Sequence, residues 1–352
     1  MSHVTLAGLL IQLPQENVFR TYRIDQNAAN AHDVPGGRFV EMDETALDHG
    51  DVLISVEYSS VNYKDALAAT GRRRVVRRLP CVGGIDLAGT VIRSAAPRFV
   101  QGMAVMATGY ELGVAHHGGY SEYALVPGGW VFPVPGRLNA CDVMAIGSAG
   151  LAAAMAITRL EENGLRPERG PVLVSGASGG VGSLAIDMLA GRGYEVVALT
   201  GKAEHQEYLL GLGATRVILR EDIELSSSTA LDKGLWAGAL DVLGGATLGW
   251  ILSSAKPGGM IACIGDGEGV ELKVGMLPFV MRGVSLIGID SVYAGFSARE
   301  KAWTRLAGDL RPRHLARIAR VIAFDDLPDA FEDLIEARTR GRTVVRITAP
   351  CG

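Results

Sequence analysis

The apolar positions of this chain change their spacing twice, and these changes divide the sequence into three parts. Up to about residue 139, short alternating runs such as Asp51–Tyr58 predict β-strands between turns marked by glycine and proline. From Val172 to Asp290, strand-like apolar runs alternate with segments of helical spacing, which predicts a parallel, doubly wound sheet. After about Ser291 this alternation ends. We expect the remaining residues to rejoin the β-rich first part, so that one domain is discontinuous in sequence.

The same spacing predicts the individual elements. In the first part we expect a strand or hairpin entry over residues 4–25, a loop or loose hairpin over residues 26–43, and a short helix over Asp65–Ala69. A long apolar helix is expected over residues 140–161, interrupted at Gly147–Gly150. Further strands are expected over residues 172–174, 195–200, 216–219, 239–243, 258–265, 284–290, 321–324 and 343–348. Further helices are expected over residues 183–189, 203–211, 246–255, 298–310 and 327–338.

A glycine-rich turn joins the first strand and helix of the middle part. Its register is Ala177-x-Gly179-x-x-Gly182, with alanine at the first position of the usual G-x-G-x-x-G pattern. Backbone N–H groups at the start of the helix carry partial positive charge and can bind a pyrophosphate, which glycines allow to come close. The turn therefore predicts a Rossmann sheet that binds a dinucleotide, the alternative being a tight turn without a ligand. The expected contacts are Ser178, Gly179, Gly180, Val181 and Gly182.

The end of the second predicted strand distinguishes between the two nicotinamide dinucleotides. In NAD-preferring folds, an acidic side chain roughly 20 residues after the glycines binds the ribose 2′-hydroxyl. Here Thr200, Gly201 and Lys202 stand at that point, and no carboxylate does. A cation and a hydroxyl suit a 2′-phosphate, which an acid would repel. The sequence therefore predicts NADP(H) as cofactor, with Arg220 at the end of the third strand as a further contact.

Two polar segments follow the strand at Asp51–Tyr58. Asn62, Tyr63 and Asp65 lie directly after it, and Asp65 is equally suited to capping the next helix, as Tyr63 is to packing. The second segment carries arginine at five of its seven positions, which are Arg72, Arg73, Arg74, Arg77 and Arg78. Such a cluster is either a solvated loop or a clamp for a substrate with phosphates, because guanidinium groups match phosphate oxygens.

Composition narrows the classes of function. The chain has 352 residues, which suggests about two domains, and its net charge of −4 gives no indication of nucleic acid or an anionic membrane as a partner. Four widely spaced cysteines form no C-x-x-C pair and indicate reduced thiols in a cytoplasmic protein. The N-terminal residues show neither a signal peptide nor a membrane span. His116 and His117 lack metal-ligand spacing and are expected in an exposed loop.

Seven segments, taken in order, resemble the zinc-independent medium-chain dehydrogenase/reductase superfamily. Within it, the chain is most similar to the quinone-oxidoreductase-like group that includes acryloyl-CoA reductases. The resemblance depends chiefly on SSVNYKDA, on the GASGGVGS turn and on the MLPF…GIDSV segment. The matching segments are residues 58–71, 83–91, 118–126, 172–185, 235–245, 276–292 and 341–347.

The resemblance implies an architecture. It consists of a GroES-like β-rich catalytic domain over residues 1–146 and 293–352, around an NADP-binding Rossmann domain over residues 147–292. Members usually form dimers, so a homodimer is expected. Where zinc-dependent relatives carry a His-Glu pair, this chain has Ile85 and Asp86, and it lacks the cysteines of their structural site. No metal is therefore expected.

The resemblance also implies roles for single residues. Tyr63 should border the nicotinamide and Asn62 and Asp65 should hold its loop, which makes Tyr63 and Asp65 the candidate catalytic residues. Ser291 and Arg342 should reach the cofactor from the far side of the cleft. Asn62 and the first three arginines of the cluster, Arg72, Arg73 and Arg74, are the candidate substrate contacts.

Three functions remain open at this level. The favoured one is reduction of the C=C bond of acryloyl-CoA to propanoyl-CoA, with hydride from NADPH added to the β-carbon and no metal. The substrate is then a small molecule, an acyl-CoA whose phosphates meet the arginines. The alternatives are NADPH-dependent reduction of quinones or enones, and NADPH binding without turnover.

Overall fold

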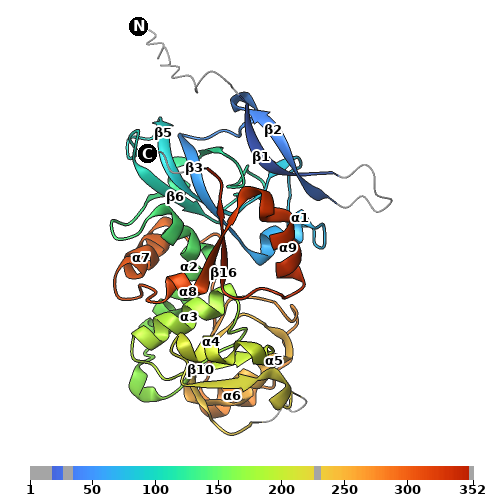
Figure 1. Ribbon diagram of the computed structural model, residues 1–352. Coiled ribbons are helices and arrows are strands. Elements are labelled where there is room, and N and C mark those ends of the chain that lie inside the picture. The colour runs from blue at the N-terminus through green and yellow to red at the C-terminus, as the bar shows by residue number, and fades with distance from the viewer. Residues whose placement is uncertain (1–17, 27–34, 226–230, 349–352) are drawn as a thin grey trace, which may run out of the picture.

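The chain builds two β-sheet regions that meet along a long helix (Figure 1). The structure is a computed structural model and describes residues 18–26, 35–225 and 231–348. The parallel sheet occupies the lower half of Figure 1, and the other two sheets occupy the upper half. The expected elements at residues 4–17 and 27–34 lie outside the described residues.

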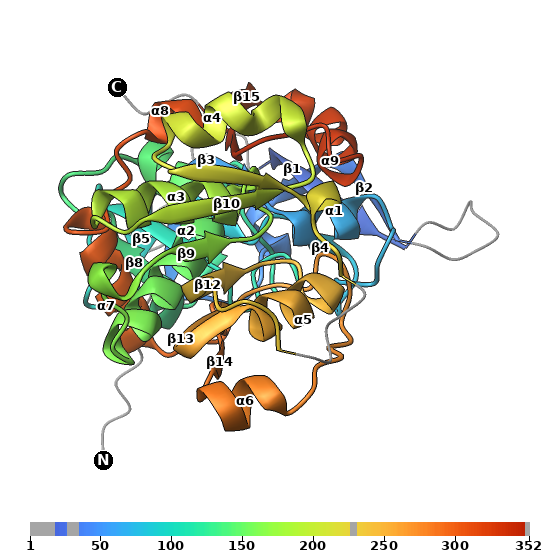
Figure 2. The same ribbon diagram turned by 90° about the horizontal axis from the view of Figure 1, so that it is seen from below.

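The lower region is a six-stranded parallel sheet with the strand order β11-β10-β9-β12-β13-β14. This order is that of a Rossmann sheet, so the predicted fold class is confirmed. Figure 2 views this sheet with helices on both faces. Its strands are β9 (Val172–Val174), β10 (Val196–Thr200), β11 (Arg216–Leu219), β12 (Trp236–Asp241), β13 (Ala255–Cys263) and β14 (Ser285–Gly288). Its helices are α3 (Gly180–Gly191), α4 (Gln206–Gly211), α5 (Gly245–Ser253) and α6 (Leu277–Arg282).

Burial on both faces explains why the strands are continuous apolar runs. In β9, Val172 and Val174 pack in the core formed with α3, while Leu173 between them packs in a second core with Leu248 and Ile251 of α5. Side chains alternate between the two faces of a strand, so each face needs its own apolar set.

The upper region contains a seven-stranded sheet and a small three-stranded one. β15 and β16 join β3 in the larger sheet, so the residues after the Rossmann region rejoin the first part as the spacing predicts. The predicted domain boundaries at residues 146/147 and 292/293 remain a prediction. The larger sheet consists of β3 (Val52–Val61), β5 (Asp86–Ser94), β6 (Ala104–Thr108), β7 (Tyr123–Val126), β8 (Val131–Pro133), β15 (Ala319–Ala323) and β16 (Arg342–Arg346). The smaller consists of β1 (Val18–Asp25), β2 (Gly36–Asp43) and β4 (Cys81–Val82).

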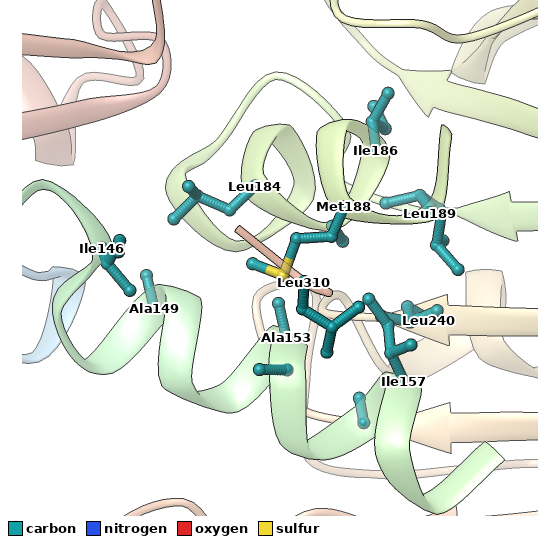
Figure 3. Packing of buried hydrophobic residues seen from close by; sticks show 14 of the residues in the cluster. Ile146, Ala149, Ala153, Ile157, Leu184, Ile186, Met188, Leu189, Leu240 and Leu310 are labelled. Carbon is teal, nitrogen blue, oxygen red and sulfur yellow. The ribbon is translucent and has the colours of Figure 1, made fainter. Parts of the chain in front are cut away.

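Helix α2 (Ala140–Glu162) is the core element between the two regions. Ile146, Ala149, Ala153 and Ile157 face Leu184 and other apolar side chains of α3 (Figure 3). The helix is long and apolar enough to cross a membrane, but 72% of its most apolar window is buried inside the protein. The expected interruption is present, because Gly147 has φ of 52° and ψ of −160° and bends the helix. The other helices of the upper region are α1 (Tyr63–Ala69), α7 (Phe296–Ala307), α8 (Leu315–Ile318) and α9 (Leu327–Ile335).

Several boundaries differ from the predicted ones. Helix α3 begins at Gly180 rather than at residue 183, because glycines that look like turn residues in sequence already form its first turn. The expected loose hairpin before residue 43 is, where described, a regular antiparallel pair of β1 and β2. Helix α6 was not predicted, since its apolar side chains are largely exposed and show no amphipathic spacing.

Candidate active site

The candidate site lies at the carboxyl ends of the parallel strands. The strand order reverses between β9 and β12, and doubly wound sheets bind ligands in the crevice outside that point. Asp241, the last residue of β12, is buried and accepts hydrogen bonds from the Ser175 hydroxyl (2.6 Å) and the Gly244 N–H (2.8 Å). These bonds hold the loops after β9 and β12 together. A groove of about 610 Å³ continues along the ends of β13 and β14, lined by residues 263–266 and 288–290.

The glycine-rich turn forms one wall of this site, and its geometry requires glycine. Gly176 has φ of +55°, and a Cβ on Gly182 would lie 2.5 Å from the carbonyl oxygen of Gly176. No side chain caps α3, so the N–H groups of its first turn have no partner within the helix. By contrast, Asn139 caps α2 by accepting a hydrogen bond from the Asp142 N–H. The bare turn fits the pyrophosphate of a dinucleotide.

The end of β10 carries a hydroxyl and a cation and no carboxylate, as the sequence predicts. Thr200 is buried and its hydroxyl lies 3.3 Å from that of Ser178, while Gly201 is exposed. Lys202 is partly buried, and its Nζ donates to the carbonyl oxygen of Thr339 (2.7 Å). Burial lowers the pKa of Lys202, so an anion beside it would be favoured. Arg220 lies near Gly201, but its Nε donates to Glu268 (3.0 Å), so its charge is already balanced.

A cluster of buried polar side chains lies above the turn and forms the second wall. Its centre is Asp86, the first residue of β5, which is fully buried. Its Oδ2 accepts from the Ser60 hydroxyl (2.7 Å) and from Nδ2 of Asn62 (2.9 Å). From α2, Ser148 donates both its N–H (3.0 Å) and its hydroxyl (2.5 Å). Four elements or loops therefore converge on this carboxylate of β5, through the residues named here and Arg342.

The kink in α2 makes this convergence possible. At Gly147 the helix breaks, and the N–H of Ser148 starts a new helical segment that points at Asp86. A helix N-terminus favours a negative charge. A Cβ on Gly147 would lie 2.6 Å from the guanidinium of Arg342 and 2.8 Å from Oδ2 of Asp86. Only glycine leaves room for the ion pair at this position.

Arg342, the first residue of β16, is buried, and its guanidinium forms hydrogen bonds within the cluster. Its guanidinium donates to Oδ1 of Asn62 (3.0 Å), the Ser60 hydroxyl (2.8 Å) and the carbonyl oxygens of Val61 and Ala145, and it lies 3.9 Å from Asp86. Its side-chain stem runs beneath the glycine turn, since a Cβ on Gly180 would meet its Cδ at 2.8 Å. The structure thus places Arg342 beneath the glycine-rich turn, in contact with both walls, and its expected role toward the cofactor remains a prediction.

Asp65 fixes the start of α1. Its carboxylate accepts from the N–H of Asn62 (3.0 Å) and, from its other oxygen, from the N–H of Ile85 (3.0 Å). Burial, followed by the nearby charge of Asp86, raises the pKa of Asp65 to about 7. Two buried carboxyl groups face one guanidinium, so a proton on Asp65 balances the charge. Asp65 is 4% exposed and therefore acts on the cleft through α1.

Tyr63 and Ser291, both predicted at the cleft, differ in their surroundings. Tyr63 is the first residue of α1 and is 51% exposed, so its side chain is open to solvent. Ser291 lies in the segment that leaves the Rossmann region, and its carbonyl oxygen accepts from the buried guanidinium of Arg299 (2.8 Å). Arg299 also donates to Thr108 at the end of β6 and so fastens this segment to the upper region.

The arginine-rich segment spans the mouth of the site. Arg73 forms an ion pair with Asp266 across the cleft (3.3 Å), and Arg72 pairs with Glu336 after α9 (3.2 Å). Arg74 is exposed and makes no ion pair with any residue that the structure describes. The two other members, Arg77 and Arg78, pair with Glu111 and Asp48. The segment is therefore exposed but partly neutralised by neighbouring acids.

His116 and His117 are buried, at 4% and 8% exposure, so the expected exposed loop is wrong. The backbone N–H of His117 donates to Asp48 (2.6 Å), and Nδ1 of its ring accepts from the N–H of Val82 (3.1 Å). The ring nitrogens of His116 lie 3.0 Å from the carbonyl oxygen of His117 and 3.1 Å from that of His49, so both rings have a structural place that the local sequence does not indicate. Among the residues that the structure describes, no three His, Cys, Asp or Glu side chains gather as a metal would require. The residues present do not fit a catalytic zinc ion.

Four residues around the cluster are not predicted from sequence as part of the site: Ser60, Asp86, Tyr120 and Ser148. Tyr120 is buried and its hydroxyl donates to the carbonyl oxygen of Ser60 (3.1 Å). The one available signal was Asp86, a charged residue at the head of an apolar strand, which requires a buried partner. The partner, Arg342, is distant in sequence and could not be identified from spacing.

Family models match both regions. Residues 48–136 match the family described as alcohol dehydrogenase GroES-like domain, and residues 180–307 match the family described as zinc-binding dehydrogenase. Of curated proteins, the putative quinone oxidoreductase YhfP of Bacillus subtilis is 48% identical over 302 residues, which cover 86% of this chain and 92% of the relative. The acrylyl-CoA reductase AcuI of Ruegeria pomeroyi is 43% identical over 305 residues, covering 87% and 92%.

Two solved structures resemble the whole described fold. The YhdH oxidoreductase of Salmonella enterica, in complex with NADP, has a TM-score of 0.89 at 39% identity and covers 94% of this chain and 100% of its own. The YhfP protein of Bacillus subtilis, with NAD bound, has a TM-score of 0.89 at 44% identity, covering 94% and 99%. Similarity at this level places the chain with these proteins over nearly its whole length.

Proposed function

This chain belongs to the zinc-independent, quinone-oxidoreductase-like group of the medium-chain dehydrogenases/reductases, and on that premise we propose that it reduces acryloyl-CoA to propanoyl-CoA with NADPH. The family makes it an oxidoreductase. The curated acrylyl-CoA reductases at 43% and 42% identity support the substrate. The observation that carries the proposal is the arginine-rich segment at the cleft, because coenzyme A brings phosphates and Arg73 reaches the Rossmann side there.

The residues of the first wall fit NADPH. The cofactor, when bound, supplies the hydride. The unpaired N–H groups at the start of α3 bind the pyrophosphate, and Lys202 binds the 2′-phosphate at a strand end without a carboxylate. Two relatives of known structure are described with NADP or NADPH bound, which supports the same cofactor here.

The second wall stabilises the charge that the reaction creates. When hydride adds to the β-carbon, negative charge develops on the thioester oxygen and needs a hydrogen-bond donor. Tyr63 is suited to this role because it is exposed at the start of α1. Asn62, Asp65, Asp86 and Arg342 then act as positioning residues, since their polar groups pair with one another and fix that helix start.

Coenzyme A phosphates can replace the acids that now pair with the arginines. The side chains of Arg73 and Asp266 are 58% and 50% exposed, and those of Arg72 and Glu336 are similarly open. Exposed pairs of this kind contribute only about 0–1 kcal/mol, so a phosphate exchanges with the carboxylate at little cost. Arg74 is available to the same phosphates without exchange.

The test compares two acryloyl thioesters. Purified protein and NADPH are mixed with acryloyl-CoA or with S-acryloyl-N-acetylcysteamine, which lacks the phosphates, and the reduced cofactor is followed by absorbance. We expect a much higher kcat/KM for acryloyl-CoA and a loss of that difference in the triple variant R72A/R73A/R74A. The variant R137A, altered at an exposed position outside this segment, is the control. No consumption of NADPH with acryloyl-CoA would contradict the proposal.

Reduction of quinones or enones is the second candidate. The observation that favours it is the relative with 48% identity, described as a putative quinone oxidoreductase. This reaction is indifferent to the acyl carrier, so the triple arginine variant should keep full activity toward a benzoquinone. Tight NADPH binding without oxidation by any of these substrates would instead identify a binding protein without turnover.

We further propose that the protein acts as a homodimer. β14 is an edge strand of the parallel sheet, and α6 lies beside it (Figure 2). Met276, which precedes α6, and Val280 and Met281 within it are 67%, 66% and 69% exposed. An edge strand with an apolar neighbour favours pairing with a second copy. Sedimentation equilibrium should give a dimer for the wild type and a monomer for V280E/M281E. V100E, at a 61% exposed position in the upper region, is the control.

We also propose that the protein is cytoplasmic. Cys81, Cys141 and Cys263 are free thiols in the described part of the chain, which suits a reducing compartment. Fractionation of cells that express the chain should recover it with cytoplasmic markers.

A further inference from the structure

A short segment from the upper region lies against the cofactor wall. Residues 336–341 connect α9 to β16, and the segment consists of the last three of them, residues 339–341. The carbonyl oxygen of Thr339 accepts from Nζ of Lys202 (2.7 Å), and the N–H of Gly341 donates to the carbonyl oxygen of Ser178 (2.9 Å). Gly341 has φ of +59°, and a Cβ there would lie 2.0 Å from the carbonyl oxygen of Ile318. The segment is therefore closely held at both of its ends.

Arg340 is the residue between these two anchors. Its guanidinium lies 4.8 Å from the ring centroid of Tyr208, the buried tyrosine of α4, in a cation–π contact. It makes no ion pair and no hydrogen bond with any residue of the described ranges. In this respect it differs from its neighbour Arg338, which pairs with Asp333 (2.9 Å), and from Arg220, which pairs with Glu268.

We propose that Arg340 is a second cation of the 2′-phosphate site, beside Lys202, and that it contributes to the preference for NADPH over NADH. The proposal rests on the proposed use of NADPH. The hydrogen bond from Lys202 to Thr339 fixes the segment within reach of the end of β10, where the 2′-phosphate is expected. Lys202 uses one of its three N–H donors on Thr339 and keeps two for the phosphate.

The side chains around Arg340 carry both signs of charge, since Glu204 and Glu207 line the same pocket. Burial lowers the pKa of His205, and the charges of Lys202 and Arg340 lower it further, against an opposing effect of Glu204. A positive charge on His205 is therefore disfavoured, and the positive charge beside it is that of Lys202 and Arg340. Arg220, the contact suggested by sequence, is held by Glu268 and Thr247. The structure thus points to Arg340 rather than Arg220 as the guanidinium available to the phosphate.

The test uses fragments of the cofactor, so that catalysis is not needed. Adenosine 2′,5′-bisphosphate carries the 2′-phosphate and 5′-AMP lacks it. Their dissociation constants are measured by calorimetry for the wild type and for R340A, R340K, R220A and R338A. We expect R340A to weaken binding of the bisphosphate about tenfold without changing that of 5′-AMP, as loss of one charge-assisted bond predicts. R340K should recover most of the loss, and R338A should have no effect.

Other outcomes overturn the proposal. If R340A binds both fragments like the wild type, or weakens both equally, Arg340 does not recognise the 2′-phosphate. If R220A alone produces the selective loss, Arg220 is the second cation. A far-UV circular dichroism spectrum and melting temperature equal to those of the wild type establish that R340A is folded, as expected for an exposed side chain. Failure of acryloyl-CoA reduction with intact discrimination between the fragments would contradict the substrate and leave this assignment standing.

Discussion

The two walls of the cleft are built on opposite principles. The Rossmann wall offers bare backbone, because the turn before α3 is glycine and no side chain caps the helix. The upper wall consists of side chains whose polar groups are paired with one another around Asp86. The first wall is complete only when a ligand supplies an anion, whereas the second is complete without one. One wall therefore binds, and the other holds a helix start in place.

The largest expected effect comes from removing Asp86, the centre of the upper wall. In D86A, Arg342 keeps a buried charge without its counter-ion, and the donors of Ser60, Asn62 and Ser148 lose their acceptor. We expect the free energy of unfolding to fall by about 3–5 kcal/mol, measured by urea denaturation. The control is D325A, which removes an exposed pair with Arg20 and should leave the free energy of unfolding nearly unchanged. Similar losses in both variants would contradict the idea of a closed charge network.

The next largest effect comes from adding a side chain to the glycine-rich turn of the Rossmann wall. In G182A the new Cβ would lie 2.5 Å from the Gly176 oxygen and 2.7 Å from Cα of Ala177, both of which are backbone atoms that cannot turn aside. We expect a loss of about 1–3 kcal/mol in stability and a loss of more than about tenfold in NADPH affinity, measured by cofactor fluorescence. G129A, where a Cβ meets nothing within 4 Å, should leave both unchanged. Unaltered affinity in G182A would show that the turn does not approach the cofactor.

A smaller effect is the dependence of stability on pH that Asp65 gives to the upper wall. The pKa of Asp65 is raised from 3.8 to about 7, so between these values the folded protein holds a proton that the unfolded chain has lost. Stability from this group therefore falls as pH rises toward the pKa of the folded protein, and the loss between pH 6 and pH 8 is on the order of 1 kcal/mol. Urea titrations at both pH values should show this loss in the wild type and not in D65N. An equal pH dependence in the two proteins would mean that Asp65 is ionised throughout.

The smallest effect is expected from removing the Ser148 hydroxyl, one of the groups that bond to Asp86 in the upper wall. S148A removes the hydrogen bond of 2.5 Å to Oδ1 of Asp86 but keeps the backbone N–H donor of the same residue. We expect a loss of about 1 kcal/mol in the free energy of unfolding. S94A, altered at a partly exposed hydroxyl that only bonds locally to Ala96, is the control. A loss as large as that of D86A would mean that the hydroxyl, and not the charge balance, maintains the cluster.

The contrast also explains what could be predicted from sequence. The Rossmann wall is local in sequence, because its strand, turn and helix are consecutive, so spacing alone predicts the Rossmann region and its glycine turn. The upper wall joins Ser60, Asp86, Ser148 and Arg342, which lie on different elements and meet only after folding. Sequence patterns indicate which residues are unusual, such as an aspartate heading an apolar strand, but not which distant side chain balances its charge. The predicted catalytic and binding roles of the named residues remain predictions.

The strand β16 has a consequence for the order in which the protein forms during synthesis. It supplies Arg342 to the cluster and follows the segment that contacts Ser178 and Lys202. The six parallel strands of the Rossmann region all precede it and are continuous in sequence, so they can assemble as a unit while the chain still emerges from the ribosome. The upper region begins earlier but must wait for its last strand, with Asp86 lacking its counter-ion Arg342 until then. The half that is translated first is thus the half that matures last.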